Sequence, residues 1–212
     1  MQGEGFLAIW SDVDAPQETD YLHWLTREHA TERLGVDGFI AMRVFRAISD
    51  TICRFLIVYE LESADALSGP AYLARLNAPT PWSQRIMPIL RNFARGGGRR
   101  AISKGTGRGG FVAALPSPQG LKDKTGIVAG LASQDRIAVA HLLETDREKT
   151  SIQTQEKNLR LKDKSFDSLL LVEGLDQTAL RKALLAFPSL LPVGVSAEDV
   201  PFYACIFAQD GP

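Results

Sequence analysis

The sequence predicts an α+β fold in which two tandem βαββαβ halves close one barrel. Strand-like and helical segments follow one another in the same order twice, in residues 1–104 and again in residues 105–212. At 212 residues the chain is long enough for two units of roughly 100 residues each. A four-stranded sheet with both helices on one face leaves its other face uncovered, and two such sheets facing each other bury both. This is the physical reason to expect two halves in one chain.

The first half is predicted from its apolar runs and from the residues that begin and end its helices. Asp14 is placed to cap the first helix, Pro16 lies in its first turn and Gly35 ends it. The predicted elements are a strand over residues 6–10, a helix over 17–34, strands over 39–48 and 54–61 joined by a hairpin turn at 49–51, helices over 63–77 and 83–90, and a strand over 99–103.

The second half repeats this order without repeating the motifs. Asp176 is placed to cap its last helix. The predicted elements are strands over residues 110–115, 136–143, 166–173 and 200–208, with helices over 121–133 and 176–187. The order β, α, β, β, α, β is that of a ferredoxin-like unit. We therefore expect two ferredoxin-like halves that form an intramolecular pseudo-dimeric α+β barrel, residues 1–104 carrying the candidate site and residues 105–212 being a degenerate copy.

Two segments depart from this plan. Residues 147–165 are too long and too charged for a hairpin loop, and Thr154 is placed to cap a short helix within them. A solvated excursion and a lid over a cavity mouth both remain open for this segment. The join between the halves, from Arg95 to Gly110, is rich in glycine and arginine. We interpret it as a flexible linker, because its G-x-G-x-x-G match precedes a strand and not a helix.

Composition restricts the classes of partner. Hydrophobic residues make up 45% of the chain, charged residues 23%, and the formal net charge is -1. This balance gives no general attraction to nucleic acid or to an acidic membrane, and no run approaches the roughly 18 apolar residues of a membrane span. No secretory leader is visible, so a cytoplasmic protein is expected. The oligomeric state stays open between a monomer with an internal pseudo-two-fold axis and a homodimer.

The cysteines and histidines argue against a metal site. Cys53 and Cys205 lie in separate apolar strands and are expected to be buried reduced thiols, with a disulfide between the halves left open. The three histidines are scattered along the chain, and neither a His-x-x-x-His nor a Cys-x-x-Cys pair occurs. We expect no metal and no cofactor.

The first helix carries the most informative pattern. At about 100° per residue, two aromatics and two carboxylates share one face of it. This face consists of Tyr21, Trp24, Leu25, Glu28 and Glu32, with His29 at its edge. A core helix would fill such a face with aliphatic residues, and a buried carboxylate is costly unless it is paired. The pattern therefore predicts a cation opposite this face.

Arg43 is the best-placed cation. In the strand over residues 39–48, alternation places Ala41, Arg43 and Phe45 on a common face. One interpretation is structural: Arg43 forms a buried ion pair with Glu28 or Glu32 that fixes the helix to the sheet.

The other interpretation is a small-molecule pocket between helix and sheet. Glu28 or His29 would then be the catalytic acid or base, and Arg43 an anion or oxyanion partner. The usual pKa of a histidine suits proton transfer near neutrality. The remaining candidates would bind the ligand, by lining the pocket or by facing it from the helix: Trp10, Tyr21, Trp24, Glu32 and Tyr59.

The first half resembles the dimeric α+β barrel superfamily, in particular EthD-like and related uncharacterised bacterial proteins. The likeness lies in the pattern Trp-x-x-x-Glu-His-x-x-Glu-Arg within residues 21–33, in residues 35–39, and in residues 72–82. It covers residues 6–100, whereas the second half is matched by element order. The chain departs from the family pattern at Leu25, where relatives often carry a histidine. The site residues to which the resemblance points are Trp24, Glu28, His29, Arg33 and Arg43.

The resemblance implies a ligand cavity more firmly than it implies a reaction. The superfamily includes cofactor-independent monooxygenases, isomerases, polyketide cyclases, haem-degrading enzymes and stress-response proteins. It therefore implies a small apolar or aromatic ligand. A cofactor-independent enzyme of the monooxygenase, isomerase or cyclase type, acting on an aromatic or polyketide-like compound, is one expectation. A non-catalytic binding or stress-response protein is the alternative, and a structural module with a filled barrel is the third.

Overall fold

Strands from both halves of the chain form a closed antiparallel barrel in the computed structural model, which describes residues 1–48, 53–118, 120–160 and 163–212. In this part of the chain, eight strands follow one another around the barrel in the order β1-β3-β2-β8-β5-β7-β6-β4. The strands are β1 (Gly5–Val13), β2 (Phe39–Ala47), β3 (Cys53–Leu61), β4 (Arg91–Gly105), β5 (Phe111–Pro116), β6 (Ile137–Thr145), β7 (Ser168–Gly174) and β8 (Phe202–Asp210).

The strand order contains the same unit twice. The first half runs β4-β1-β3-β2 and the second half β8-β5-β7-β6, which is the ferredoxin-like order in both cases. The halves are joined where β2 pairs with β8 and where β4 pairs with β6. The barrel thus closes within one chain, and the predicted fold of tandem ferredoxin-like halves is confirmed. The predicted hairpin turn at 49–51 lies outside the described residues.

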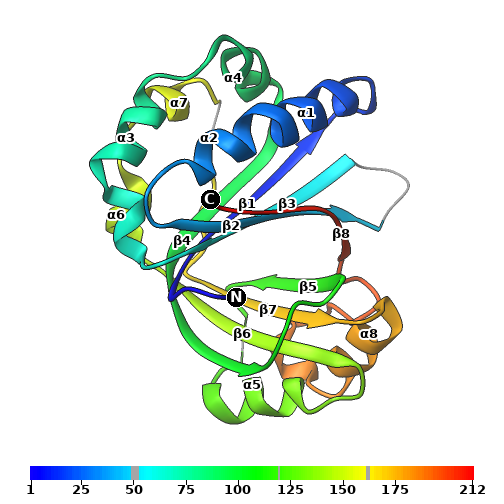
Figure 1. Ribbon diagram of the computed structural model, residues 1–212. Helices are drawn as coiled ribbons and strands as arrows, with labels where there is room; N and C mark the ends of the chain where they lie inside the picture. The colour runs from blue at the N-terminus through cyan, green and yellow to red at the C-terminus, as the bar shows by residue number, and fades with distance from the viewer. Residues whose placement is uncertain (49–52, 119, 161–162) are drawn as a thin grey trace.

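Helices cover the barrel on two opposite sides, as Figure 1 shows. The group of α1 to α4 packs on the outer face of the N-terminal sheet, and α5 and α8 pack on the outer face of the C-terminal sheet. The helical segments are η1 (Ala15–Gln17), α1 (Glu18–Trp24), η2 (Leu25–His29), α2 (Ala30–Leu34), η3 (Ala64–Ser68), α3 (Pro70–Asn77), α4 (Pro81–Ile86), η4 (Met87–Ile89), α5 (Lys124–Ala132), α6 (Arg147–Ser151), α7 (Gln155–Asn158), α8 (Gln177–Leu185) and η5 (Pro188–Leu190).

Alternation along the strands separates three buried layers. Met42 and Val44 belong to the layer under the N-terminal helices, whereas Phe45 belongs to the barrel interior. Leu170 and Val172 belong to the layer under the C-terminal helices. The barrel interior is therefore a third core that both sheets share, and it is filled by side chains such as those of Phe6 and Leu171.

The glycine-rich join is a strand, so its interpretation as a flexible linker was wrong. β4 runs unbroken for 15 residues, and pairs first with β1 and then with β6. Gly96, Gly97 and Gly98 are buried within it. A Cβ atom on Gly98 would overlap the carbonyl oxygen of Glu144 on β6. The glycines are therefore required by the close approach of neighbouring backbones, not by flexibility.

Other expectations about the chain are settled by the same coordinates. Cys53 and Cys205 are both free thiols, the first buried and the second half-buried. Asp176 caps its helix as predicted, since its side chain accepts a hydrogen bond from the backbone N–H of Ala179. The predicted cap at Asp14 was wrong, because its side chain accepts no such hydrogen bond from the described residues. Within the residues described, no helix combines the length and the apolar character that a membrane crossing requires.

The close approach at Gly98 predicts a large effect of one added carbon atom. Gly98→Ala is expected to lower the free energy of unfolding by about 2 kcal/mol or more, because backbone must move to admit the methyl group. Gly110→Ala is the matched control, since nothing lies within 4 Å of a Cβ atom there. Urea unfolding followed by circular dichroism measures both. Equal stability of the two variants would show that β4 and β6 separate easily.

Candidate functional site

A π-helical turn decides which residues of the first helical segment face the sheet. The turn spans Leu25–His29, between α1 and α2. A π turn inserts one residue into the helical repeat, and such turns are frequent at functional sites. The buried face therefore advances by one position after Leu25, so that His29 and Arg33 are buried while Glu28 and Glu32 are only partly buried. The α-helical projection of the sequence was wrong at this point.

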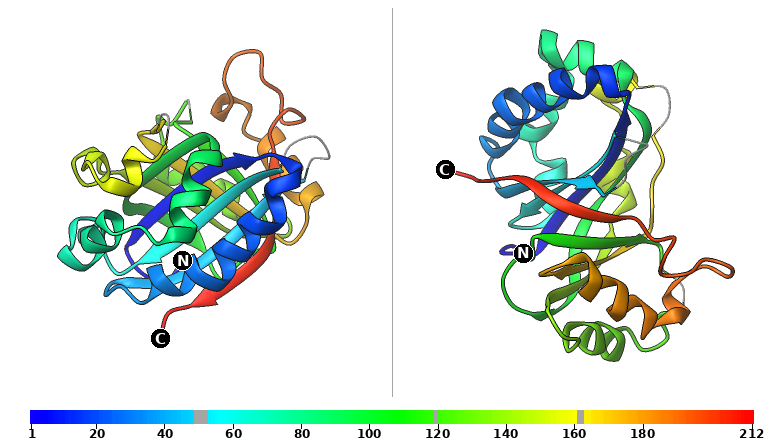
Figure 2. Two further views of the ribbon diagram at one scale, coloured as in Figure 1. Left: turned by 90° about the horizontal axis from the view of Figure 1, so that it is seen from above. Right: turned by 90° about the vertical axis from the view of Figure 1, so that its right-hand side faces the viewer.

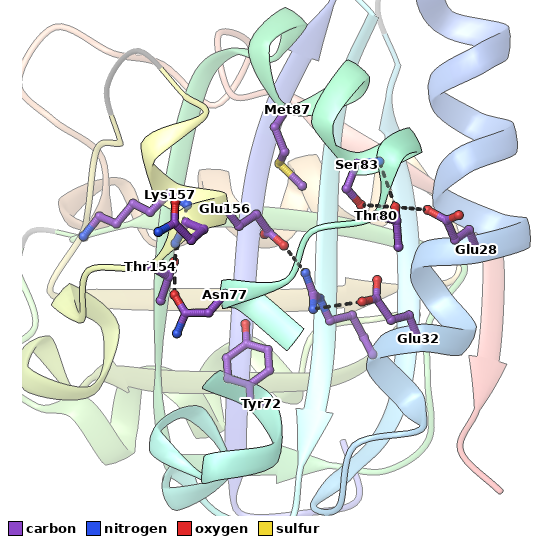
Figure 3. A network of polar contacts seen from close by, with 12 residues as sticks. Glu28, Glu32, Tyr72, Asn77, Thr80, Ser83, Met87, Thr154, Glu156 and Lys157 are labelled. Carbon is purple, nitrogen blue, oxygen red and sulfur yellow. Dashed lines mark hydrogen bonds and ion pairs between the residues drawn. The ribbon is translucent and has the colours of Figure 1, made fainter. Parts of the chain in front are cut away.

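Arg33 lies at the centre of a buried polar cluster. Its Nη2 donates to Oε2 of Glu156 on α7, and its Nη1 lies 4.0 Å from Oε1 of Glu32. The guanidinium also lies over the ring of Tyr72, 5.7 Å from its centroid. Figure 3 shows the carboxylates of Glu32 and Glu156 turned toward the same point from opposite sides.

The segment between β6 and β7 completes this cluster from the other half of the chain. Thr154 caps α7, as predicted, by accepting a hydrogen bond from the backbone N–H of Lys157. Glu156 and Arg160 are both buried, although they come from a segment with alternating charges. Arg160 lies over the ring of Phe93, 4.1 Å from its centroid. The part of the segment around Thr154 to Arg160 therefore packs on the N-terminal layer, while residues such as Arg147 and Glu148 are exposed.

Three buried polar atoms of the cluster have no hydrogen-bond partner among the described residues. They are Nδ1 of His29, Nη1 of Arg33 and the hydroxyl oxygen of Tyr59. An unpartnered polar atom away from water costs about 1–3 kcal/mol. These three atoms are the hydrogen-bonding groups of the cluster that a bound molecule or an ordered water can pair with.

The surroundings of His29 and Tyr59 fix their protonation. Burial, and then the positive charges of Arg33 and Arg160, hold the pKa of His29 well below its usual value. Burial raises the pKa of Tyr59 well above its usual value, and Arg33 opposes this rise. Both groups are neutral near pH 7. The neutral imidazole has one ring nitrogen that accepts a hydrogen bond, and the phenol can donate one.

Aromatic side chains form the walls of the cluster. The ring of His29 stacks on Trp24, with centroids 4.3 Å apart. Phe39 lies between Tyr59 and Tyr72, at centroid distances of 5.6 Å and 5.0 Å. These rings give the cluster an apolar body around its few polar atoms.

The other helix residues predicted for the site hold the helix in place. Nε1 of Trp24 donates to Oγ of Ser83 at 3.1 Å. Thr80 donates to Oε1 of Glu28 at 2.6 Å. The hydroxyls of Tyr21 and Ser11 are 3.0 Å apart. Glu28 and Tyr21 therefore tie the helix to its neighbours, and Glu32 lies beside Arg33 at the margin of the cluster.

Arg43 does not face the first helix, so neither predicted role beside Glu28 or Glu32 is correct. It points into the barrel, because Met42 and Val44 take the positions toward the helices. Its two terminal nitrogens donate to both carboxylate oxygens of Glu173 at 2.7 Å and 2.6 Å. Its Nε lies 3.6 Å from Oε1 of Glu60.

The barrel interior repeats this arrangement in the other half. Arg43 lies two residues beyond the partner of Glu60 on β2, and His141 lies two residues beyond the partner of Glu173 on β6. Nδ1 of His141 lies 2.8 Å from Oγ of Ser103, and burial is the first cause that lowers the pKa of His141 to about 3. His141 is buried, and its Nε2 has no hydrogen-bond partner among the described residues.

Trp10 is also absent from the helix–sheet layer. It points into the barrel, where Nε1 donates to the hydroxyl of Tyr203 at 3.2 Å. The predicted site is thus divided between the two sides of the sheet. The cluster retains His29, Trp24, Tyr59 and Glu32, with Tyr21 and Glu28 nearby, whereas Arg43 and Trp10 lie on the far side of the sheet.

Sequence reasoning missed the part of the cluster that comes from far along the chain. Tyr72, Glu156 and Arg160 were not named, and Arg33 was named from the resemblance and as a nearby cation. The cap at Thr154 inside a charged segment was the one available signal. In the described part of the chain, no group of three His, Cys, Asp or Glu side chains is arranged to hold a metal ion.

The equivalent layer of the C-terminal half is different. Its packing against α5 and α8 consists of apolar side chains such as Val128, Leu142 and Leu180. The buried charged side chains of β6 and β7 that the structure describes, His141 and Glu173, point into the barrel instead. A buried polar cluster is therefore no requirement of this fold, and the N-terminal cluster needs another reason.

The ion pair between Arg33 and Glu156 predicts a strong dependence of stability on Glu156. Glu156→Gln is expected to lower the free energy of unfolding by about 3 kcal/mol, because Arg33 stays buried without its charge partner. Glu148→Gln, on the exposed side of the same segment, is the matched control. Urea unfolding measures both, and an equal effect of the two changes would contradict a buried pair.

The lowered pKa of His29 predicts a loss of stability in acid. In the unfolded chain this histidine binds a proton near pH 6.5, whereas in the folded chain it stays neutral. Its contribution to the free energy of unfolding is therefore complete above pH 6.5 and declines as the pH falls below it. Between pH 6.5 and pH 5 the free energy of unfolding of the wild type should fall by about 2 kcal/mol more than that of His29→Gln. Denaturant unfolding at both pH values measures this, with His23→Gln as the control for removing a histidine from α1. Identical pH dependence of wild type and His29→Gln would refute it.

Comparisons with known proteins identify the fold and nothing finer. The sequence matches no family model and no curated protein. A protein provisionally assigned as a monooxygenase, from Fusobacterium nucleatum subsp. nucleatum ATCC 25586, has a TM-score of 0.56 at 14% identity, covering 99% of this chain and 96% of its own. An anthrone oxidase-like protein has a TM-score of 0.60 at 10% identity, covering 99% and 94%.

A mutant chlorite dismutase of Candidatus Nitrospira defluvii is similar in the same way. Its TM-score is 0.51 at 9% identity, with 97% of this chain and 92% of that chain covered. Identities this low establish shared architecture only. By its architecture, the chain shares its α+β barrel fold with these three proteins.

Proposed function

We propose that the protein binds a planar aromatic molecule in the N-terminal helix–sheet layer and removes a proton from it. The observation that carries this proposal is the set of three unpartnered polar atoms, on His29, Arg33 and Tyr59, in one buried cluster. The apolar layer in the equivalent half supports it, because it indicates that the fold is stable without such atoms.

The walls of the cluster favour a flat ligand. The indole of Trp24 and the ring of Phe39 face the same layer, which also contains Tyr59 and Tyr72. Aromatic rings pack well in offset or edge-on contacts with other rings, and each such contact adds about 0.5–1.5 kcal/mol beyond the buried area. A fused-ring compound would make several of them at once.

The three polar atoms suit a ligand that carries an oxygen next to an acidic hydrogen. Nη1 of Arg33 and the hydroxyl of Tyr59 are both donors, and they would hold a carbonyl, enol or phenol oxygen. Neutral His29 would accept the proton. Negative charge that develops on the oxygen during this transfer would be stabilised by the buried guanidinium.

The low pKa of His29 has two kinds of cause. Burial, the larger cause, disfavours the charged imidazolium and would likewise disfavour an enolate or phenolate, so it opposes the transfer. The positive charges of Arg33 and Arg160 also lower the pKa of His29, but they favour a negative charge on a bound ligand. Proton transfer therefore requires that the buried guanidinium meets the oxygen on which the negative charge develops.

An anthrone is the probe that fits this chemistry. It is planar, its carbonyl activates a methylene group, and a structurally similar protein is anthrone oxidase-like. Proton removal gives an enolate, which dioxygen oxidises. One oxygen atom enters the new carbonyl, and the other leaves as water with the two methylene hydrogens. Dioxygen is thus the oxidant, and the chain supplies base and donors.

Binding without chemistry is the second candidate function. The observation in its favour is that Glu156 and Arg160 close the cluster and that Glu156 already neutralises Arg33. A closed, neutralised cluster suits a protein that retains its ligand. In this case His29 would act as a hydrogen-bond partner and no product would form.

Oxygen uptake with anthrone separates the two functions. We expect wild type to convert anthrone to anthraquinone and His29→Gln to be slower by about 100-fold or more, which is the usual contribution of a general base. Tyr59→Phe should be slower by a smaller factor. Thermal stabilisation by anthrone without turnover would favour the binding function. Neither stabilisation nor turnover, in protein shown to be folded, would refute both.

A further inference from the structure

The open end of the barrel contains a pocket that is separate from the helix–sheet cluster. Its volume is about 610 Å³, and its wall comes from β1, β4, β5, β8 and the segments around residues 164–166 and 190–201. This volume is typical of sites for small organic molecules. His29, Arg33 and Tyr59 are not part of its lining.

Aromatic side chains form the inner wall of this pocket. Trp10 and Phe166 meet edge to face, with ring centroids 5.3 Å apart. Tyr203 accepts a hydrogen bond from Nε1 of Trp10, and among the described residues its own hydroxyl proton meets no acceptor. The inner wall is therefore apolar, with side chains such as those of Leu115 and Leu191, except for one buried donor, the hydroxyl of Tyr203.

Positive charge lies at the rim. Arg54 uses Nε and Nη2 to bind Asp12, and its Nη1 has no partner among the residues that the structure describes. Lys164 is exposed and forms no ion pair with any described residue. The one carboxylate of the rim, Asp199, is already held by the backbone and hydroxyl of Ser196.

We propose that this pocket binds an aromatic acid. The rings would lie against Trp10 and Phe166, and the carboxylate would meet Lys164, Nη1 of Arg54 and the hydroxyl of Tyr203. Charge complementarity favours an anion, because two cations lie at the rim: Lys164 forms no ion pair with any described residue, whereas Arg54 is already paired with Asp12. The aromatic side chains of the wall favour a ligand that itself contains aromatic rings.

An exposed apolar loop beside the pocket agrees with this assignment. Figure 2 shows the segment between α8 and β8, in orange, projecting from the body of the molecule. Val193 in this segment is 99% exposed, and Val195 lines the pocket. Apolar side chains of this loop are therefore placed where a ligand in the pocket could cover them.

Two probes of the same shape test the role of charge. We expect 2-naphthoate to bind and to raise the melting temperature, and neutral 2-naphthamide to bind at least fivefold more weakly. Lys164→Gln should weaken the binding of 2-naphthoate about fivefold or more and leave the affinity for 2-naphthamide unchanged. Lys104→Gln, at the other end of β4, is the matched control and should change neither.

Titration calorimetry decides the outcome. Equal affinity for the two probes, or an equal effect of Lys164→Gln on both, would overturn the assignment of an acid. If neither probe binds at millimolar concentration, the proposal of a binding site in this pocket is wrong. Tyr203→Phe gives a second measurement on the hydroxyl, with a several-fold loss expected for 2-naphthoate. His29→Gln should leave 2-naphthoate binding intact, so the result stands apart from the proposed proton transfer.

Discussion

The ion pair between Arg43 and Glu173 is the constraint on which the rest of the structure depends. It joins β2 of the first half to β7 of the second with two hydrogen bonds inside the barrel. Burial alone would lower the pKa of Arg43, but the hydrogen bond and charge of Glu173 raise it above its usual value. A buried charge is tolerated only with such a partner. Each half therefore fixes the register of the other, and the barrel interior is filled at this end.

A filled interior leaves two kinds of place where a ligand can bind, the open end of the barrel and the layers between sheet and helices. The halves differ sharply in those layers. The C-terminal layer is apolar, whereas the N-terminal layer contains Arg33, His29 and Tyr59. Glu156 and Arg160 complete the N-terminal layer from the second half. The two halves thus share one scaffold, and the long connection between β6 and β7 adds Glu156 and Arg160 to the polar layer of the N-terminal half.

The π turn at Leu25–His29 decides which residues of the first helical segment face the sheet. Without it, Glu28 and Glu32 would face the sheet and His29 would lie at the edge. With one residue inserted, His29 and Arg33 take the inner positions and Glu28 turns toward Thr80. Such turns cost helix hydrogen bonds, so their presence beside unpartnered polar atoms is consistent with selection for a site.

The sequence by itself determined the order of the elements, the two ferredoxin-like halves, the caps at Thr154 and Asp176, and the unusual character of the first helix. These depend on local patterns of apolar and capping residues, which a sequence records directly. Only the tertiary structure decided which side of the sheet Arg43 and Trp10 face, that Glu156 pairs with Arg33, and that the glycine-rich join is a strand. These depend on strand pairing and on contacts between residues more than 100 positions apart, and on one inserted residue in a helix, none of which a periodic pattern can carry.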